Sequence, residues 1–105
     1  MLVANKANIR EISSEEVVIF EGNGNSQGDI VAGMTSGKSV TNNSYLNGKV
    51  ENKGDVRIWA GKMTSKGDLT SAPFTVTDAG VLKCKSDKGN SIELKDGTIW
   101  FVIDG

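Results

Sequence analysis

The chain has 105 residues, of which 37% are hydrophobic, 12 are basic, 13 are acidic and none is histidine. This length suits one ordinary domain, and the net charge of −1 gives no electrostatic reason to expect nucleic acid or an anionic membrane as a partner. Without histidine the chain lacks the commonest general base and the commonest transition-metal ligand. We therefore expect no enzymatic activity, no catalytic residues, no metal site and no bound cofactor.

The sequence shows no membrane span and no secretion signal. No run approaches the roughly 18 apolar residues that a span requires, and residues 1–6 lack the pattern of a signal peptide. We expect a soluble chain made in the cytoplasm. The one cysteine, Cys84, lies between Lys83 and Lys85 and cannot form an intrachain disulfide. We expect it to face inward from a strand whose lysines face outward; a reactive thiol beside two ammonium groups is the alternative.

Strand patterns dominate the first half of the chain, residues 1–53. Residues 16–21 form a β-branched and aromatic run, residues 22–28 contain no apolar side chain and predict a turn or loop, and residues 29–34 predict a second strand. The polar stretch over 35–53 is interrupted by few apolar residues. It fits either a long surface excursion or extended chain that becomes ordered against a partner.

The second half, residues 54–105, predicts a β-meander. Val56, Ile58 and Ala60 alternate with Arg57 and Trp59, which predicts a half-buried strand. A strand over 73–77 follows, and then turns at 78–80, 87–89 and 96–97 separate strands around 81–84, 91–94 and 98–103. The fold class is therefore all-β, with short antiparallel strands and Gly-rich turns in a single domain over 1–105.

Two pairs of similar segments within the chain suggest an elongated or stacked assembly. The segment over 28–36 reappears with small insertions over 54–65, and residues 1–6 resemble residues 81–86. Repeats that follow one another along a chain are typical of such assemblies. The half over 1–53 is thus the weaker, repeat-like half, and its start resembles the continuation of a unit.

Two binding motifs have alternative explanations. Residues 32–39 fit the relaxed P-loop pattern, but residues 40–44 are a poor helix start, and a P-loop needs a helix directly after it. Glu21, Asn23, Asn25 and Asp29 resemble a calcium loop, but Ser26 stands where the EF-hand has glycine. We expect no nucleotide binding at the first segment and a solvated, turn-rich loop at the second.

The aromatic residues Trp59, Trp100 and Tyr45 are the candidate contact residues. Trp59 is out of phase with the other apolar residues of its strand, so one tryptophan is expected to face away from the core. An outward tryptophan serves either as a sugar-stacking platform or as a subunit contact. A small hydrolase with paired carboxylates is a further alternative, although no spacing selects a pair.

The second half also resembles a known group of proteins. Residues 54–61 (GDVRIWAG) and 71–82 (SAPFTVTDAGVL) are similar to a block found in phage and prophage tail fibres, tail tips and host-specificity proteins. Residues 1–9 (MLVANKANI) are similar to the segment that trails this block. The resemblance covers about half the chain; Thr75, Ala79 and Cys84 depart from it.

The resemblance implies a structural or adhesion module of a virion tail, in a homotrimer and in contact with other tail proteins. It transfers no site residue. The alternative, from a different functional class, is a carbohydrate-binding domain that recognises cell-surface glycans.

Overall fold

The computed structural model describes residues 6–23, 26–37, 39–40, 50–86 and 88–103. These residues form nine β-strands and one short 3-10 turn, η1. In chain order the elements are β1 (Glu16–Asn23), β2 (Ser26–Thr35), β3 (Ser39–Val40), β4 (Val50–Glu51), β5 (Val56–Ala60), η1 (Leu69–Ser71), β6 (Phe74–Thr77), β7 (Leu82–Lys85), β8 (Ser91–Lys95) and β9 (Thr98–Val102).

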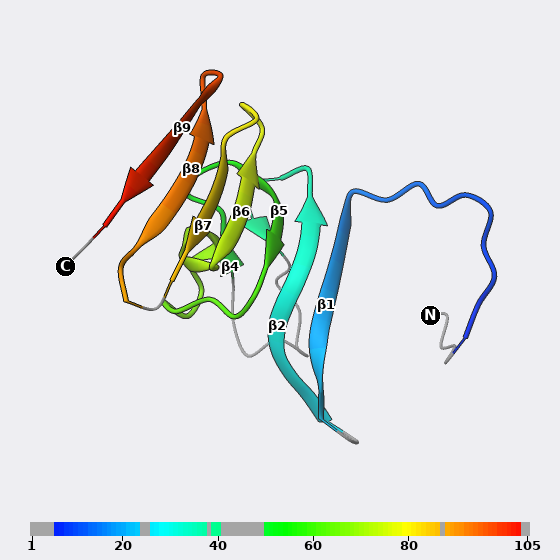
Figure 1. Ribbon diagram of the computed structural model, residues 1–105. Coiled ribbons are helices and arrows are strands. Elements are labelled where there is room, and N and C mark those ends of the chain that lie inside the picture. Colours follow the sequence, from blue (N-terminus) through cyan, green and yellow to red (C-terminus); the bar gives the residue numbers. More distant parts are fainter. Residues whose placement is uncertain (1–5, 24–25, 38, 41–49, 87, 104–105) are drawn as a thin grey trace.

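Seven of these strands form one antiparallel sheet in the order β1-β2-β5-β6-β7-β8-β9, and β3 pairs with β4 separately. From β5 to β9 each strand pairs with the next one along the chain, which confirms the predicted meander. The all-β fold class is confirmed, and the molecule is elongated (Figure 1). The similar segments over 28–36 and 54–65 contain most of β2 and all of β5, and these two strands lie side by side. Ahead of β1, the chain runs away from the sheet as an extended arm (Figure 1).

The sequence predicts the turn of one terminal hairpin of the sheet correctly and the turn of the other incorrectly. In the β1–β2 hairpin, strand pairing continues as far as Asn23 and Ser26, so the loop predicted over 22–28 is wrong in extent. In the β8–β9 hairpin, Asp96 and Gly97 have φ angles of 52° and 72°. Two successive positive φ angles are what a two-residue type I′ turn requires, and this turn is where the sequence predicts it.

A β-bulge in β5 decides which face each of its side chains occupies. Between the pairs that Val56 and Ile58 make with β6, Arg57 is an extra residue. Because side chains alternate between the faces of a strand, one extra residue inverts the alternation beyond it. Val56 and Trp59 therefore share a face. The prediction that Val56, Ile58 and Ala60 lie on one face is wrong for this reason.

A cover layer, which we define as β3, β4 and η1, lies over one face of the sheet. Trp59 and Val56 from the sheet pack there against Val40 and Leu69 from the cover layer. The full set of buried core residues is Ile30, Val40, Val50, Val56, Trp59, Leu69 and Ala72. The hydrophobic core thus lies under the middle of the sheet.

Asn52 fastens the cover layer to the sheet. Its side chain is buried, and its Nδ2 donates hydrogen bonds to the carbonyl oxygens of Gly37 (3.0 Å) and Val56 (2.6 Å). Its Oδ1 accepts a hydrogen bond from the backbone nitrogen of Val56 (2.7 Å). The sequence left the segment 35–53 open between a surface excursion and chain ordered by a partner; its described residues Val40, Val50 and Asn52 are instead buried against the sheet.

Candidate interaction surfaces

The face of the sheet opposite the cover layer carries two rows of apolar side chains, which we call the apolar stripe. Cross-strand partners share a face, so the strand register assigns each residue to its row. The first row contains Val17, Met34, Ile58, Val76, Leu82, Leu94 and Ile99. The second row contains Ile19, Ala32, Ala60, Phe74, Cys84, Ile92 and Phe101. Each row crosses all seven strands without a charged side chain.

The described part of the chain leaves the apolar stripe open to solvent. Phe101 is 69% exposed, Ile99 is 58% exposed, and Ile19, Met34 and Ile58 are also exposed. A soluble monomer rarely presents a continuous apolar patch of this extent, and such patches usually mark interaction sites. The stripe is therefore the first candidate interaction surface.

Ion pairs lie at both ends of the strands that carry the apolar stripe. At one end Arg57 Nη2 lies 3.6 Å from Asp78 Oδ2. At the other end Lys62 Nζ lies 3.0 Å from Glu21 Oε2 and 3.8 Å from Asp29 Oδ2. The hydrogen bond to Glu21 and the charge of Glu21 raise the pKa of Lys62 above its ordinary value. Two carboxylates of the calcium-loop pattern thus contact an ammonium group.

Cys84 lies within the second row and is exposed. Lys83 and Lys85, its neighbours on β7, lie on the other face because side chains alternate along a strand. The predicted alternation of the cysteine with the lysines is therefore confirmed. The predicted inward position of Cys84 is wrong, because its face of the sheet has no cover among the described residues. The predicted outward position of the lysines is also wrong, because Lys83 and Lys85 lie on the side of the cover layer.

Trp59 lies on the covered face and is 1% exposed. Its cross-strand partner is Gly33, and a Cβ atom at Gly33 would overlap the Trp59 ring. The indole Nε1 is buried without a hydrogen-bond partner among the described residues. The prediction that Trp59 faces away from the core is wrong, because the bulge at Arg57 turns it toward the cover layer.

Trp100 lies on the same face as Trp59 but beyond the cover layer. The register places Thr75, Lys83, Glu93 and Trp100 in one row across β6 to β9. Trp100 is 56% exposed, on the edge strand of the sheet. Of the three candidate contact residues, Trp100 is therefore the accessible one that the structure describes. Tyr45 lies outside the described residues.

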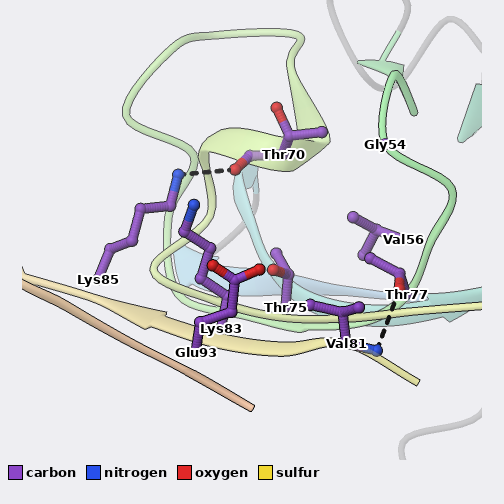
Figure 2. A pocket seen from close by; sticks show the side chains of 9 residues that line it. All are labelled: Gly54, Val56, Thr70, Thr75, Thr77, Val81, Lys83, Lys85 and Glu93. Atoms are coloured by element: carbon purple, nitrogen blue, oxygen red, sulfur yellow. Dashed lines mark hydrogen bonds between the residues drawn. The ribbon is translucent and has the colours of Figure 1, made fainter. Parts of the chain in front are cut away.

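A polar hollow of about 260 Å³ lies between this row and the cover layer (Figure 2). Lys85 Nζ crosses to the cover layer and donates a hydrogen bond to the carbonyl oxygen of Thr70 (3.0 Å). Lys83 and Glu93 point into the same hollow (Figure 2). The lining residues are Gly54, Val56, Thr70, Thr75, Thr77, Val81, Lys83, Lys85 and Glu93. The hollow and Trp100 together form the second candidate surface, with donors, acceptors and an aromatic ring.

The segment that fits the P-loop pattern belongs to strands. Residues 32–35 are part of β2, and residues 39–40 form β3. The described residues of the pattern are strand and bend residues and not the first turn of a helix, so their backbone amides are not gathered at a helix N-terminus, as a phosphate cradle would need. The described residues also contain no helix long and apolar enough to cross a membrane.

Comparisons with known proteins add no relative to this picture. No family model, no curated protein and no solved structure matches the chain.

Two features of these surfaces escape sequence reasoning. The apolar stripe is visible in the sequence as alternation in each strand, but the alternation does not say which face the rest of the chain covers. The polar hollow depends on contacts between β7 and η1, which are separated along the chain by β6. Its lysine and glutamate side chains look like an ordinary solvated strand face in the sequence.

Proposed function

We propose that this chain is a non-enzymatic structural or adhesion module of a phage or prophage tail that works as a homo-oligomer, with the trimer as the form that the resemblance implies. The observation that carries the proposal is the apolar stripe. Transfer of apolar surface out of water is the main driving force of association. The cover layer of this chain shields one face of the sheet and leaves an apolar face exposed. An exposed apolar face of this kind is typical of a subunit that buries it against a partner.

The resemblance to tail proteins supports the tail assignment. The two segments that carry it, 54–61 and 71–82, contain β5, β6 and the first residue of β7, in the middle of the sheet. They contribute to the apolar stripe the residues Ile58, Ala60, Phe74, Val76 and Leu82. The shared segments thus supply the middle of the proposed contact surface. The proposal places the chain in the virion tail, after synthesis in the bacterial cytoplasm and next to other tail proteins.

Mass spectrometry of purified particles tests this function. Cultures of the bacterium that carries the gene are induced, particles are purified on a density gradient, and tryptic peptides of this chain are quantified against a known capsid protein. We expect the peptides to co-purify with particles and gold-labelled antibodies to mark the tail. Peptides confined to the soluble fraction, in a preparation that contains intact tails, would contradict the proposal.

A second candidate function is glycan recognition at the polar hollow. The favouring observation is the row in which Trp100 directly follows Glu93 and Lys83 on an open face. Sugar rings bind to proteins through an aromatic ring against their C–H face and through polar groups that pair with their hydroxyls. Trp100 supplies the ring, Glu93 the acceptors and Lys83 the donors.

Adjacent residues on β9 provide a matched pair of variants for this candidate. Trp100 and Phe101 are both aromatic and both more than half exposed, but they lie on opposite faces of the sheet. On a glycan array we expect Trp100→Ala to lose binding by about tenfold or more and Phe101→Ala to retain it. Binding that is lost equally in both variants, or that the wild-type chain does not show, would contradict glycan recognition at this row.

A further inference from the structure

The shape of the apolar stripe limits what can cover it. It is two residues wide along each strand and crosses seven strands, so it is a long and narrow surface. Eight of its large side chains are between 39% and 69% exposed, which amounts to on the order of 700 Å² of apolar area, close to the roughly 800 Å² that each partner buries in a standard interface. One partner of matching size is enough to bury it.

The polar groups at the borders of the stripe do not oppose association of identical copies. Lys62 is paired with Glu21 and Asp29, and Arg57 is paired with Asp78, within the same chain. Because these cations are already beside carboxylates, two identical borders that approach each other do not bring unpaired like charges together. Within the two rows themselves no charge selects a partner of opposite sign.

The surface relief of the stripe also suits a copy of itself. The second row contains small side chains at Ala32, Ala60 and Cys84 and large ones at Phe74 and Phe101. Two sheets that pack face to face are about 10 Å apart and interdigitate large side chains with small ones. A surface that carries both kinds of side chain therefore offers the knobs and the spaces that a second copy needs.

We propose that the apolar stripe is the contact surface between copies of this chain, and that its occupant is the stripe of another copy. The inference deepens the proposed function and rests on it for the premise that the chain works within an assembly. It assigns the contact to one face of the sheet, and it leaves Trp100 and the polar hollow on the outside of the assembly. Cys84, in the second row, is buried by the contact.

Cys84 gives a direct readout because it is the sole cysteine of the chain. The full chain is examined by sedimentation velocity, and the reaction of Cys84 with Ellman's reagent is timed at several protein concentrations. We expect a discrete species of two or three copies, in which the thiol reacts about tenfold or more slowly than in a monomer because it is buried. The rate should rise toward that of the monomer on dilution.

Two variants that replace the same residue type locate the contact. Ile58→Lys places a charge in the first row, at a position exposed in the single chain. Ile12→Lys places the same charge outside the stripe, on the exposed arm ahead of β1. We expect Ile58→Lys to be a folded monomer by circular dichroism with a fast-reacting thiol, and Ile12→Lys to behave like the wild-type chain. If Ile58→Lys loses its β-sheet signal, Ile99→Lys, at a more exposed position of the same row, provides the same test.

Three results would overturn the inference: a monomeric wild-type chain with an accessible Cys84, an oligomer whose Cys84 stays as reactive as in the monomer, or open-ended aggregation in place of a discrete species. None of these decides the tail assignment, which is read from particle composition. A chain that is present in tails but monomeric with a reactive thiol defeats the inference alone. A chain that is absent from particles but oligomeric through the stripe defeats the proposed function alone.

Discussion

Strand β5 carries apolar side chains on both faces of the sheet, but those on one face are buried and those on the other are exposed. On one face Trp59 and Val56 are buried under β3, β4 and η1. On the other face Ile58 is exposed, although it belongs to the same strand. The difference arises because β3 and β4, which precede β5, and η1, which precedes β6, all lie over the same face.

This comparison shows that hydropathy alone does not make a core in this molecule. A β-meander with short turns has no spare chain to cover either face, so burial depends on the few long connections. In the described part of the chain, the elements within these connections, β3, β4 and η1, lie over the face that holds Trp59. The opposite face is exposed in the single chain, and this exposure is the basis of the proposed intermolecular contact.

The two tryptophans offer the largest expected contrast between a covered and an uncovered position. Both lie on the covered side of the sheet, but Trp59 is under the cover layer and Trp100 is beyond it. We expect Trp59→Ala to lower the free energy of unfolding by about 3–5 kcal/mol, since it leaves a cavity in the core. We expect Trp100→Ala to lower it by less than about 1 kcal/mol. Urea unfolding at one fixed protein concentration measures both.

The same pair carries its own control. The fluorescence of the folded Trp100→Ala variant reports Trp59 alone and should be blue-shifted, as expected for an indole out of contact with water. Equal losses of stability in the two variants would show that the cover layer does not distinguish the two positions.

The sequence predicts the sheet better than it predicts the surfaces. Strand positions and the Asp96–Gly97 turn follow from local patterns, namely β-branched runs and residues that tolerate positive φ. The bulge at Arg57 has no local signal, yet this one residue reverses the faces assigned to Trp59 and Ile58. The apolar stripe and the polar hollow arise from register and from long-range contacts, which a single sequence does not display.

The attachment of the cover layer gives the second-largest expected effect. Asn52→Ala removes the hydrogen bonds to Gly37 and Val56 and leaves backbone groups of Val56 without their partner. We expect a loss of about 2–3 kcal/mol, since buried polar groups are costly to leave unpaired. Because the layer loosens, Trp59 fluorescence should also become more easily quenched by acrylamide. Lys53→Ala, at the next and exposed position, should change neither measurement.

The β8–β9 hairpin extends beyond the cover layer and depends on pairing and on its turn. Gly97 has a φ of 72°, and an added Cβ atom would meet nothing within 4 Å. The cost of Gly97→Ala is therefore conformational alone, about 1–2 kcal/mol. We expect faster amide hydrogen exchange in β9, with exchange in β5 changed only in proportion to global stability. If β5 and β9 lose protection equally and only by global unfolding, the hairpin is not an independently opening unit.

The ion pair at the border of the apolar stripe gives the smallest effect, and it depends on pH. The hydrogen bond and charge of Glu21 raise the pKa of Lys62 in the folded chain above the ordinary value of 10.5, with a further contribution from Asp29. A cation whose folded pKa is raised stabilises the fold fully below its unfolded pKa and loses that contribution as pH rises through the folded pKa. Relative to Lys62→Met, the wild-type chain should thus be slightly more stable at pH 8, and the difference should shrink above pH 10.5. Urea unfolding of both proteins at the two ends of this range, at low and high salt, measures the change. A difference that stays constant with pH would show that Lys62 acts through packing of its methylene groups and not through its charge.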